Sequence, residues 1–339
     1  MKLSKLIALT LVFGLVIMFV IGFLAGFDNI AGVLASADYK FVALAIAFQA
    51  MSVIALFFRW EFIVRYCRLK ISDSRLFMIT LAGIAFSHLM PSSRMGGEPV
   101  RAYFLRKESG KGTSVCLSTI IVERIFDAMM FSIISLIVLI AIVLFWNLPL
   151  WLIFLLVVAF AISSLMLFVM VYISVNKKVG MRMAMWALKK FGRFLSRWKT
   201  MSEWEKKLAT DVKMYSENVA SMIKKKDLWG LGLGFSVLIW LFDIFRTYFI
   251  FLALGTDVSI LVIGGAIVIA SLAGAIPISP GGLGLIETGM MVVFASAGVP
   301  IVVAGMVTII DRLISYWGLT FVGLIPSYYL GIKKYPGSR

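Results

Sequence analysis

The sequence contains very few residues that could bind a metal or act as a nucleophile. It has two cysteines, Cys67 and Cys116, and a single histidine, His88, in 339 residues. The two cysteines lack the spacing of zinc ligands and give no reason to form a pair. One histidine alone builds neither a zinc site nor a Ser-His-Asp triad. The composition therefore argues against a metalloenzyme or a serine hydrolase, and we expect no cofactor and no metal.

Charged residues are also scarce, at 15% of the chain, whereas hydrophobic residues make up 61% and the mean hydropathy is +1.01. A soluble domain of this size could not cover so much apolar surface. Runs of about 20 apolar residues recur, and this is the length that crosses a hydrocarbon core of roughly 30 Å. The sequence predicts an all-α integral membrane protein with about six full transmembrane helices. They are expected at about 6–27, 40–60, 113–146, 149–174, 229–254 and 300–330.

Acidic residues number 17 against 33 Lys and Arg, which gives a net charge of +16. In the expected topology, 28 of the 33 basic residues lie on one side, four arginines lie within spans, and Lys40 lies on the other side. Basic loops face the cytoplasm. We therefore expect a multi-pass protein of the cell membrane with both termini cytoplasmic, and no role with nucleic acid. The first apolar run is long for a signal peptide, so we expect a retained anchor.

Proline and glycine interrupt two short apolar segments, 76–90 and 260–276, which end in "PSSRMGGEPVR" and "PISPGGLGLIE". Each break follows an arginine-bearing span and precedes a span that contains an acid–arginine pair. The anchors of this order are Arg59, Pro91 and Arg124 in the first half and Arg246, Pro277 and Arg312 in the second. With three full spans per half, the second copy would enter the membrane inverted. Paired broken segments of this kind indicate a transporter-type binding site near the membrane midplane.

This repeat predicts two membrane domains. The first repeat covers 1–146, with a re-entrant hairpin at about 76–112. The second covers 147–339, with a cytoplasmic insert at 177–227 and a re-entrant hairpin at about 260–299. The alternative is a chance correspondence of short motifs.

The broken segments suggest a way to bind an anion. A glycine-rich break leaves peptide N–H groups at the start of the next half-helix, where the helix dipole favours negative charge. Pro99 suits a first helical turn, where its missing N–H costs nothing. Two opposed hairpins would direct two such ends toward one cavity, and a lipid phosphate would fit there. The alternative is that the glycines only allow helices to cross closely.

Ionisable residues inside predicted spans give a second indication, because each is costly in a bilayer. In one interpretation they form structural ion pairs. In the other, arginines hold a phosphate and carboxylates gate it or take up a proton; we expect a mixture, with Arg94 and Arg101 gathering the headgroup. The candidate substrate-binding residues are Arg59, Ser92, Arg94, Gly96, Gly97, Glu98, Arg101, Glu123, Arg124, Asp127, Asp243, Arg246, Pro277, Ser279, Pro280, Gly281, Gly282, Gly284, Glu287, Asp311 and Arg312.

The stretches "PSSRMGGEPVRAYFLRK", "VERIFD" and "PISPGGLGLIE" resemble the lysylphosphatidylglycerol synthase transmembrane (flippase-like) family, and the resemblance covers essentially the whole chain. It implies an integral membrane domain that translocates a lipid; founding members move an aminoacylated phosphatidylglycerol made by a fused cytosolic domain. No such aminoacyl-transferase domain is visible here, so we expect a stand-alone membrane domain. By its motifs the resemblance assigns function to Gly96, Gly97, Glu98, Arg101, Glu123, Arg124, Pro277, Pro280, Gly281, Gly282, Gly284 and Glu287.

Segment 177–227 is the one substantial polar piece of the sequence. Apolar residues form two helical stripes in it, and basic residues lie mostly elsewhere. The first stripe is Met185, Leu188, Leu195 and Trp198, and the second is Leu208, Val212, Tyr215, Val219 and Met222. Basic amphipathic helices with Trp favour the anionic inner leaflet. The alternative is a docking surface for a cytosolic lipid-modifying enzyme.

Together these patterns predict a lipid flippase or transporter. Its substrate would be an anionic or phosphate-containing phospholipid, with an aminoacylated one included, and the sequence allows an oligomer. One alternative is a membrane glycosyltransferase-like enzyme that acts on a lipid carrier, although no DxD motif occurs in 91–112 or 177–227. Another is a non-catalytic membrane partner of a lipid-modifying synthase.

Overall fold

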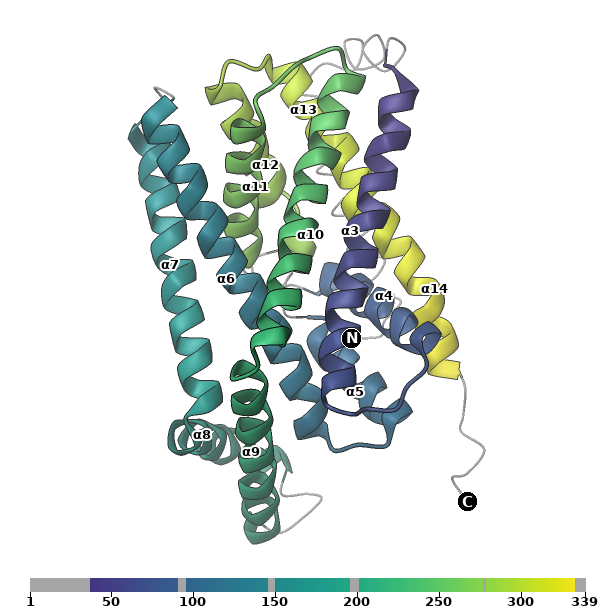
Figure 1. Ribbon diagram of the computed structural model, residues 1–339, viewed down its shortest axis with the longest axis vertical. Coiled ribbons are helices and arrows are strands. Elements are labelled where there is room, and N and C mark those ends of the chain that lie inside the picture. The colour runs from purple at the N-terminus through teal and green to yellow at the C-terminus, as the bar shows by residue number, and fades with distance from the viewer. Residues whose placement is uncertain (1–36, 91–95, 146–149, 196–200, 277–278, 333–339) are drawn as a thin grey trace.

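The computed structural model describes residues 37–90, 96–145, 150–195, 201–276 and 279–332, and in these ranges the protein is helical without strands (Figure 1). This confirms the all-α membrane protein. The helices are α3 (Tyr39–Tyr66), α4 (Asp73–Leu89), α5 (Glu98–Ser109), α6 (Thr113–Phe145), α7 (Leu150–Val175), α8 (Lys177–Leu195), α9 (Met201–Ile223), α10 (Lys226–Ala253), α11 (Ile260–Ala275), the 3₁₀ turn η1 (Pro280–Gly282), α12 (Leu285–Ser296), α13 (Ile301–Arg312), the π-helical segment η2 (Leu313–Gly318) and α14 (Leu319–Ile332).

Five helices in the described ranges are long and apolar enough to cross a membrane. They are Tyr39–Tyr66, Thr113–Ala141, Ile153–Val175, Lys226–Ala253 and Ile301–Gly331, where η2 joins α13 to α14. They agree with five of the six expected spans. The sixth, at about 6–27, lies outside the described residues.

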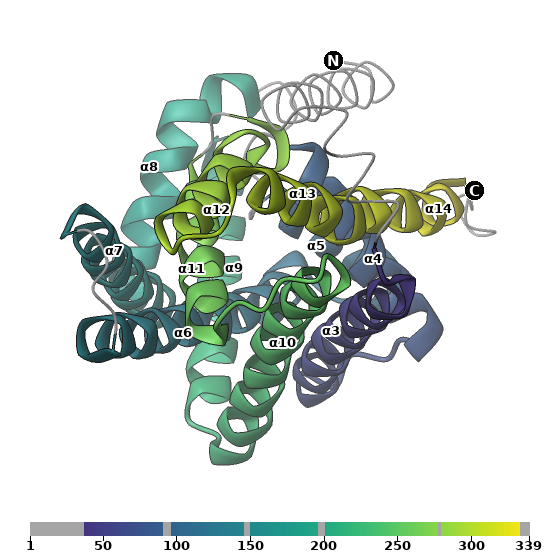
Figure 2. The ribbon, with the colours of Figure 1, turned by 90° about the horizontal axis from the view of Figure 1, so that it is seen from above.

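Helices α3 and α10 lie side by side and antiparallel on one side of the bundle (Figures 1 and 2). The backbone N–H of Asp38, which caps α3, donates to the carbonyl of Ala253 at the end of α10 over 2.9 Å. Along the pair, the ring of Phe48 packs against Phe245 and Phe249 at centroid distances of 5.6 and 5.1 Å. This pairing brings Arg59 and Arg246, the first anchors of the two predicted repeats, onto neighbouring helices.

Two short helical hairpins enter the bundle from opposite ends. In Figure 1, α4–α5 occupies the lower half and α11–α12 the upper half. Their breaks meet in the middle, because Gly281 N–H lies 3.4 Å from the Met90 carbonyl and the Tyr316 hydroxyl donates to the His88 carbonyl over 3.0 Å. This geometry suits two re-entrant hairpins; the division of the chain into two repeat domains stays a prediction.

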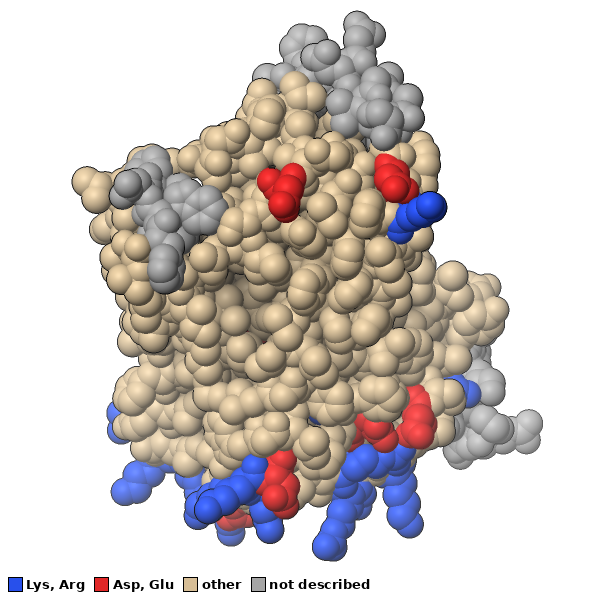
Figure 3. Space-filling view, turned by 45° about the horizontal axis from the view of Figure 1, so that its top comes forward, with Lys and Arg blue, Asp and Glu red and all other residues tan. Residues whose placement is uncertain are grey.

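Basic side chains gather at the end of the molecule where α8 and α9 lie (Figure 3). At the other end the described charges are Asp38, Lys40 and Asp257, all exposed. This uneven distribution of charge between the two ends agrees with the count of basic residues on each side made from the sequence.

The connecting segment forms the two expected helices, but they differ in environment. In α9, Val219 and Met222 are fully buried in a cluster with Ile125 and Phe126 of α6. The interpretation of this second stripe as lipid-facing was wrong, because it packs on protein. Helix α8 instead exposes Met183 (48%) and Trp186 (59%). The side chains of Leu188, Leu195 and Trp198 from the first stripe lie outside the described residues.

An exposed ion pair joins the two connecting helices. Lys177 donates to Glu217 over 2.7 Å, and this hydrogen bond lowers the pKa of the Glu217 carboxyl. Exposed pairs contribute little stability. It is the buried Val219 and Met222, therefore, that fix α9 on the bundle.

Candidate functional site

A cavity of about 300 Å³ lies at the centre of the bundle, where the two hairpins meet. Helices α3, α4, α10, α11, α12, α13 and α14 and segments η1 and η2 all contribute to its wall. Apolar residues such as Val53 and Ile267 line part of it. Its polar and charged lining residues are Gln49, Ser52, His88, Asp243, Arg246, Ser271, Asp311, Arg312, Ser315 and Tyr316. The cavity therefore brings charged and polar side chains together within an apolar bundle.

Arg246 organises one wall of the cavity. Its Nε donates to Asp311 over 2.8 Å, and its Nη1 donates to Asp243 over 2.8 Å and to Gln49 over 2.6 Å. Asp311 also accepts from the hydroxyl of Thr247 over 3.0 Å. These contacts join α3, α10 and α13, which supports the expectation that ion pairs fix the packing.

Arg312 also lines the cavity and connects its wall to the second break. Its Nε donates to Glu287 over 2.6 Å, and its Nη2 donates to the Gly281 carbonyl over 3.1 Å. Its guanidinium also lies 4.6 Å from the centre of the Tyr316 ring. Glu287 in turn accepts from Gly284 N–H over 2.6 Å and so caps α12. Glu287 therefore stabilises the break through Gly284 and Arg312 and does not itself line the cavity.

The N–H groups of the three glycines described in this break are not free, which corrects our expectation. Gly281 N–H is directed to Met90 over 3.4 Å, Gly282 donates to Ser279 over 3.2 Å, and Gly284 donates to Glu287. In the first break, Gly97 N–H donates to the hydroxyl of Ser87 over 3.1 Å. The protein satisfies these donors itself, because a buried N–H without a partner is costly. These four glycine N–H groups are therefore not left for a ligand.

Gly281 is required by this geometry. Its φ of +58° lies in the left-handed region, and a Cβ there would overlap with the ring of Tyr316. Tyr316 stacks on His88 at 4.6 Å and is 1% exposed. One side chain therefore contacts both hairpin tips and Arg312.

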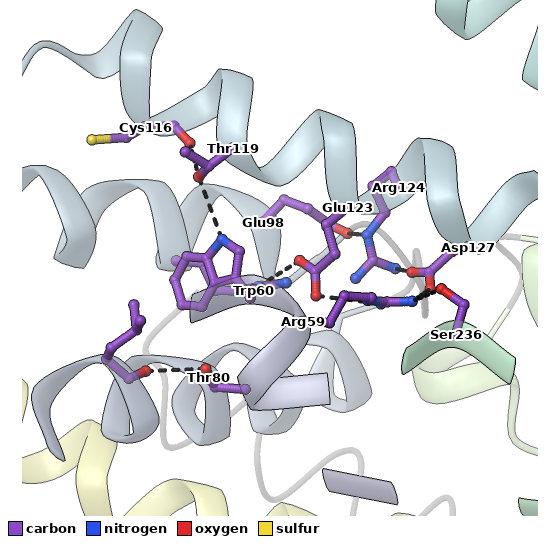
Figure 4. Close-up of polar contacts among 12 residues, drawn as sticks. Arg59, Trp60, Thr80, Glu98, Cys116, Thr119, Glu123, Arg124, Asp127 and Ser236 are labelled. Atoms are coloured by element: carbon purple, nitrogen blue, oxygen red, sulfur yellow. Dashed lines mark hydrogen bonds and ion pairs between the residues drawn. The ribbon is translucent and has the colours of Figure 1, made fainter. Parts of the chain in front are cut away.

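A second ion-pair cluster lies in the first half of the chain and does not line the cavity (Figure 4). Glu123 is fully buried between Arg59 Nη2, at 3.4 Å, and Arg101 Nη2, at 2.5 Å. Arg124 pairs with Glu98 at 3.3 Å and with Asp127 at 3.0 Å. The Arg59 guanidinium also contacts Asp127 at 2.6 Å. These residues hold α3, α5 and α6 together.

The two clusters have the same plan. In each half, the arginine of the long span pairs with the glutamate of the hairpin, as Arg124–Glu98 and Arg312–Glu287. In each half, the arginine of the span before the hairpin pairs with an acid of the long span, and this acid directly precedes the long span's own arginine. These are Arg59–Glu123 and Arg246–Asp311. The correspondence matches the anchors of the predicted repeat.

The chain matches the model of the lysylphosphatidylglycerol synthase TM region over residues 7–323. It belongs to this family. It is 33% identical over 325 residues to a UPF0104 membrane protein of Methanothermobacter thermautotrophicus, covering 96% of this chain and 95% of the relative. It is 28% identical to UPF0104 membrane protein MJ1595 of Methanocaldococcus jannaschii, over 96% and 94% of the two chains, and to PH1989 of Pyrococcus horikoshii, over 93% and 94%. The protein is thus a multi-pass membrane protein of a family that supports a role connected with membrane lipids.

In this lysylphosphatidylglycerol synthase TM family member, the predicted site residues fall into three groups. Those lining the cavity are Asp243, Arg246, Gly281, Asp311 and Arg312, and those building the break beside it are Ser279, Pro280, Gly282, Gly284 and Glu287. Those at the first break or in the first cluster are Arg59, Gly96, Gly97, Glu98, Arg101, Glu123, Arg124 and Asp127. Ser92, Arg94 and Pro277 lie outside the described residues.

The sequence interpretation missed several cavity residues, among them Gln49, Ser52 and Tyr316. A usable signal existed for two of them. Gln49 and Ser52 are three apart in an apolar helix and so share one face. The role of Tyr316 had no local signal, because aromatic residues are common throughout this chain.

Proposed function

We propose that this protein moves a phosphate-containing lipid between the two leaflets of a membrane, with the headgroup passing through the central cavity. The observation that carries the proposal is that Arg246 and Arg312 both line one cavity, at the meeting point of two opposed hairpins. The lipid's acyl chains would remain among the apolar helices and the bilayer.

The cavity suits a headgroup in size and chemistry. Its volume of about 300 Å³ lies at the lower end of the range for small-molecule sites. Charged groups at membrane depth cost about 2.5–3.5 kcal/mol each, so they are rare without a function or a partner. In the described part of the chain, Arg246 Nη2 and Arg312 Nη1 make no hydrogen bond. Guanidinium N–H groups are well suited to phosphate oxygens.

The proposal extends to the setting of the protein. We take the hairpins as re-entrant and the protein as a cell-membrane protein with both termini cytoplasmic; the basic end that carries α8 and α9 supports this orientation. Met183 and Trp186 on α8 would enter the anionic inner leaflet. A cytosolic lipid-modifying enzyme is a possible supplier of the substrate on this side.

The test is a leaflet-protection assay on purified protein in proteoliposomes. Labelled phospholipids with anionic, zwitterionic and aminoacylated headgroups would be compared. We expect headgroup-selective exchange, and its loss in Arg312→Ala. Arg182→Ala, at an exposed position on α8, is the matched control and should keep the wild-type rate.

Absence of exchange for every lipid, with protein that elutes as a folded species, would contradict the proposal. In that case a non-catalytic partner role becomes the better account. That role predicts co-purification of a soluble lipid-modifying enzyme that is lost when 177–227 is deleted.

A further inference from the structure

Among the residues that the structure describes, the charges around the cavity do not balance. The described part of its walls and of the second break contains two guanidinium groups and three carboxylates: Arg246, Arg312, Asp243, Asp311 and Glu287. The first cluster, by contrast, has three of each: Arg59, Arg101, Arg124, Glu98, Glu123 and Asp127. With every group ionised, these five described side chains carry one negative charge in excess. An uncompensated charge at membrane depth is costly, and a bound proton would neutralise it.

The excess charge can be assigned to one carboxylate. Asp311 and Glu287 are each 4% exposed and accept hydrogen bonds on both oxygens. Asp243 is 30% exposed, and both of its bonds, from Arg246 at 2.8 Å and Ser52 at 3.1 Å, go to Oδ1. In the described part of the chain, its Oδ2 accepts no hydrogen bond. Asp243 therefore lines the cavity and has one carboxylate oxygen that these donors leave open.

The surroundings of Asp243 leave few other groups to take up a proton. From α3 it faces Gln49 and Ser52, which do not titrate, and from its own helix it faces Arg246. From α13, Asp311 is held by three donors and Arg312 is paired with Glu287. Two other residues that line the cavity are Tyr316, which donates to a carbonyl, and His88, whose Nδ1 is bonded to Thr320. Among these carboxylates, Asp243 is the one with an oxygen that accepts no hydrogen bond in the described part of the chain.

We propose that Asp243 is the proton-binding residue of this transporter and that one proton accompanies each phosphate headgroup through the cavity. A proton from water binds at Oδ2 on one side of the membrane and is released to water on the other. Protonation weakens the hold of Asp243 on Arg246 Nη1 and removes the excess negative charge. Arg246 then becomes available to the incoming phosphate. This inference rests on the proposed function, which it extends by naming the coupled ion.

Exchange rates measured over a range of pH test the proposal. In vesicles with equal pH on both sides, between about pH 5 and 8, one-proton linkage predicts that wild-type exchange rises toward low pH by up to tenfold per unit. Asp243→Asn should show less than a twofold change over the same range, whatever its absolute rate. Asp243→Glu, which restores a carboxyl group, should regain the dependence. Asp227→Asn, at an exposed position on the same helix, is the control and should behave as wild type.

A second measurement reads the proton directly and does not need transport. Infrared difference spectra between the two ends of the pH range should contain a protonated-carboxyl band in wild type and Asp227→Asn, and lose it in Asp243→Asn. Exchange that is independent of pH, together with the absence of this band, would overturn the proton step and leave lipid movement intact. Absence of exchange with the band present would overturn transport and leave Asp243 as a titrating group.

Discussion

At the scale of single residues, buried arginine–carboxylate pairs do most of the positioning. Glu287 and Arg312 are both buried, at 3% and 8% exposure of the whole residue. Their contact of 2.6 Å connects a hairpin to a long span. Breaking such a pair leaves one charge buried and alone, which usually costs about 3–5 kcal/mol. The attraction between the two charges therefore contributes less to stability than the loss of one partner would cost.

This asymmetry gives the first prediction. Arg312→Gln should lower the stability of the protein by about 3–5 kcal/mol, because Glu287 is left without its cation. Adding Glu287→Gln to the same chain should restore part of that loss, since no unpaired charge then remains. Thermal unfolding in detergent measures both. A double variant no more stable than Arg312→Gln alone would show that the pair is not the cause.

Tyr316 gives the second prediction. Tyr316→Phe keeps the ring against His88 and Gly281 but removes the donor to the buried His88 carbonyl, which should cost about 1–3 kcal/mol. Tyr328→Phe, at a side chain that is 68% exposed, should change stability by less than about 0.5 kcal/mol. Equal unfolding temperatures for the two variants would exclude a role for the hydroxyl in joining the hairpins.

Most charged residues of the site could be predicted from the sequence, because a charge in an apolar run is rare and stands out. Asp243, Arg246, Asp311 and Arg312 were found in this way and do line the cavity. The sequence could not separate them from the first cluster, since which pairs face a cavity depends on how distant helices pack. Tyr316 was missed because its partners are backbone atoms in other segments.

At the scale of elements, the positions of the two breaks were predicted well, but the hydrogen bonding of their glycine N–H groups was not. Both fall where the proline and glycine pattern indicated, and Pro99 lies in the first turn of α5. Their glycines, however, serve close approach and turning rather than anion binding by free amides. A sequence reveals that the backbone must turn, but not which acceptors the rest of the fold will bring to its N–H groups.

The third prediction concerns this close approach. Gly281→Ala places a methyl group against the Tyr316 ring at a positive φ, so the hairpin tips must separate, at a cost of about 1–3 kcal/mol or more. Gly230→Ala lies in α10 with open space around it and should be neutral or stabilising by about 0.5–1 kcal/mol. Denaturation of both variants in detergent distinguishes these outcomes. A stable Gly281→Ala protein would show that the contact with Tyr316 is dispensable.

Helix α9 illustrates a limit of pattern analysis. The apolar stripe through Val219 and Met222 was correctly predicted as one helix face, but it packs on α6 and not on lipid headgroups. Periodicity reports that a face is buried and carries no information about what buries it. Helix α8, with Trp186 exposed, remains the better candidate for a helix at the membrane surface.

At the scale of the whole molecule, the distribution of charge indicates an orientation, which is the fourth prediction. In a background without Cys67 and Cys116, an impermeant thiol reagent should label Lys40→Cys in intact cells. The same reagent should label Lys177→Cys only after the membrane is opened, because basic segments stay cytoplasmic. Labelling of position 177 from outside would reverse the orientation.

The central claim is that a lipid headgroup passes through the cavity between the hairpins. The most direct test uses Val53, an apolar residue of the cavity wall, as Val53→Cys in the same cysteine-free background. Lipid exchange is measured in proteoliposomes before and after the introduced thiol is modified with a bulky polar reagent, and Val169→Cys on α7, which is 42% exposed and outside the wall, serves as the control. The account predicts that modification at position 53 abolishes exchange and that the control keeps its rate. Unchanged exchange after complete modification at position 53 would contradict it.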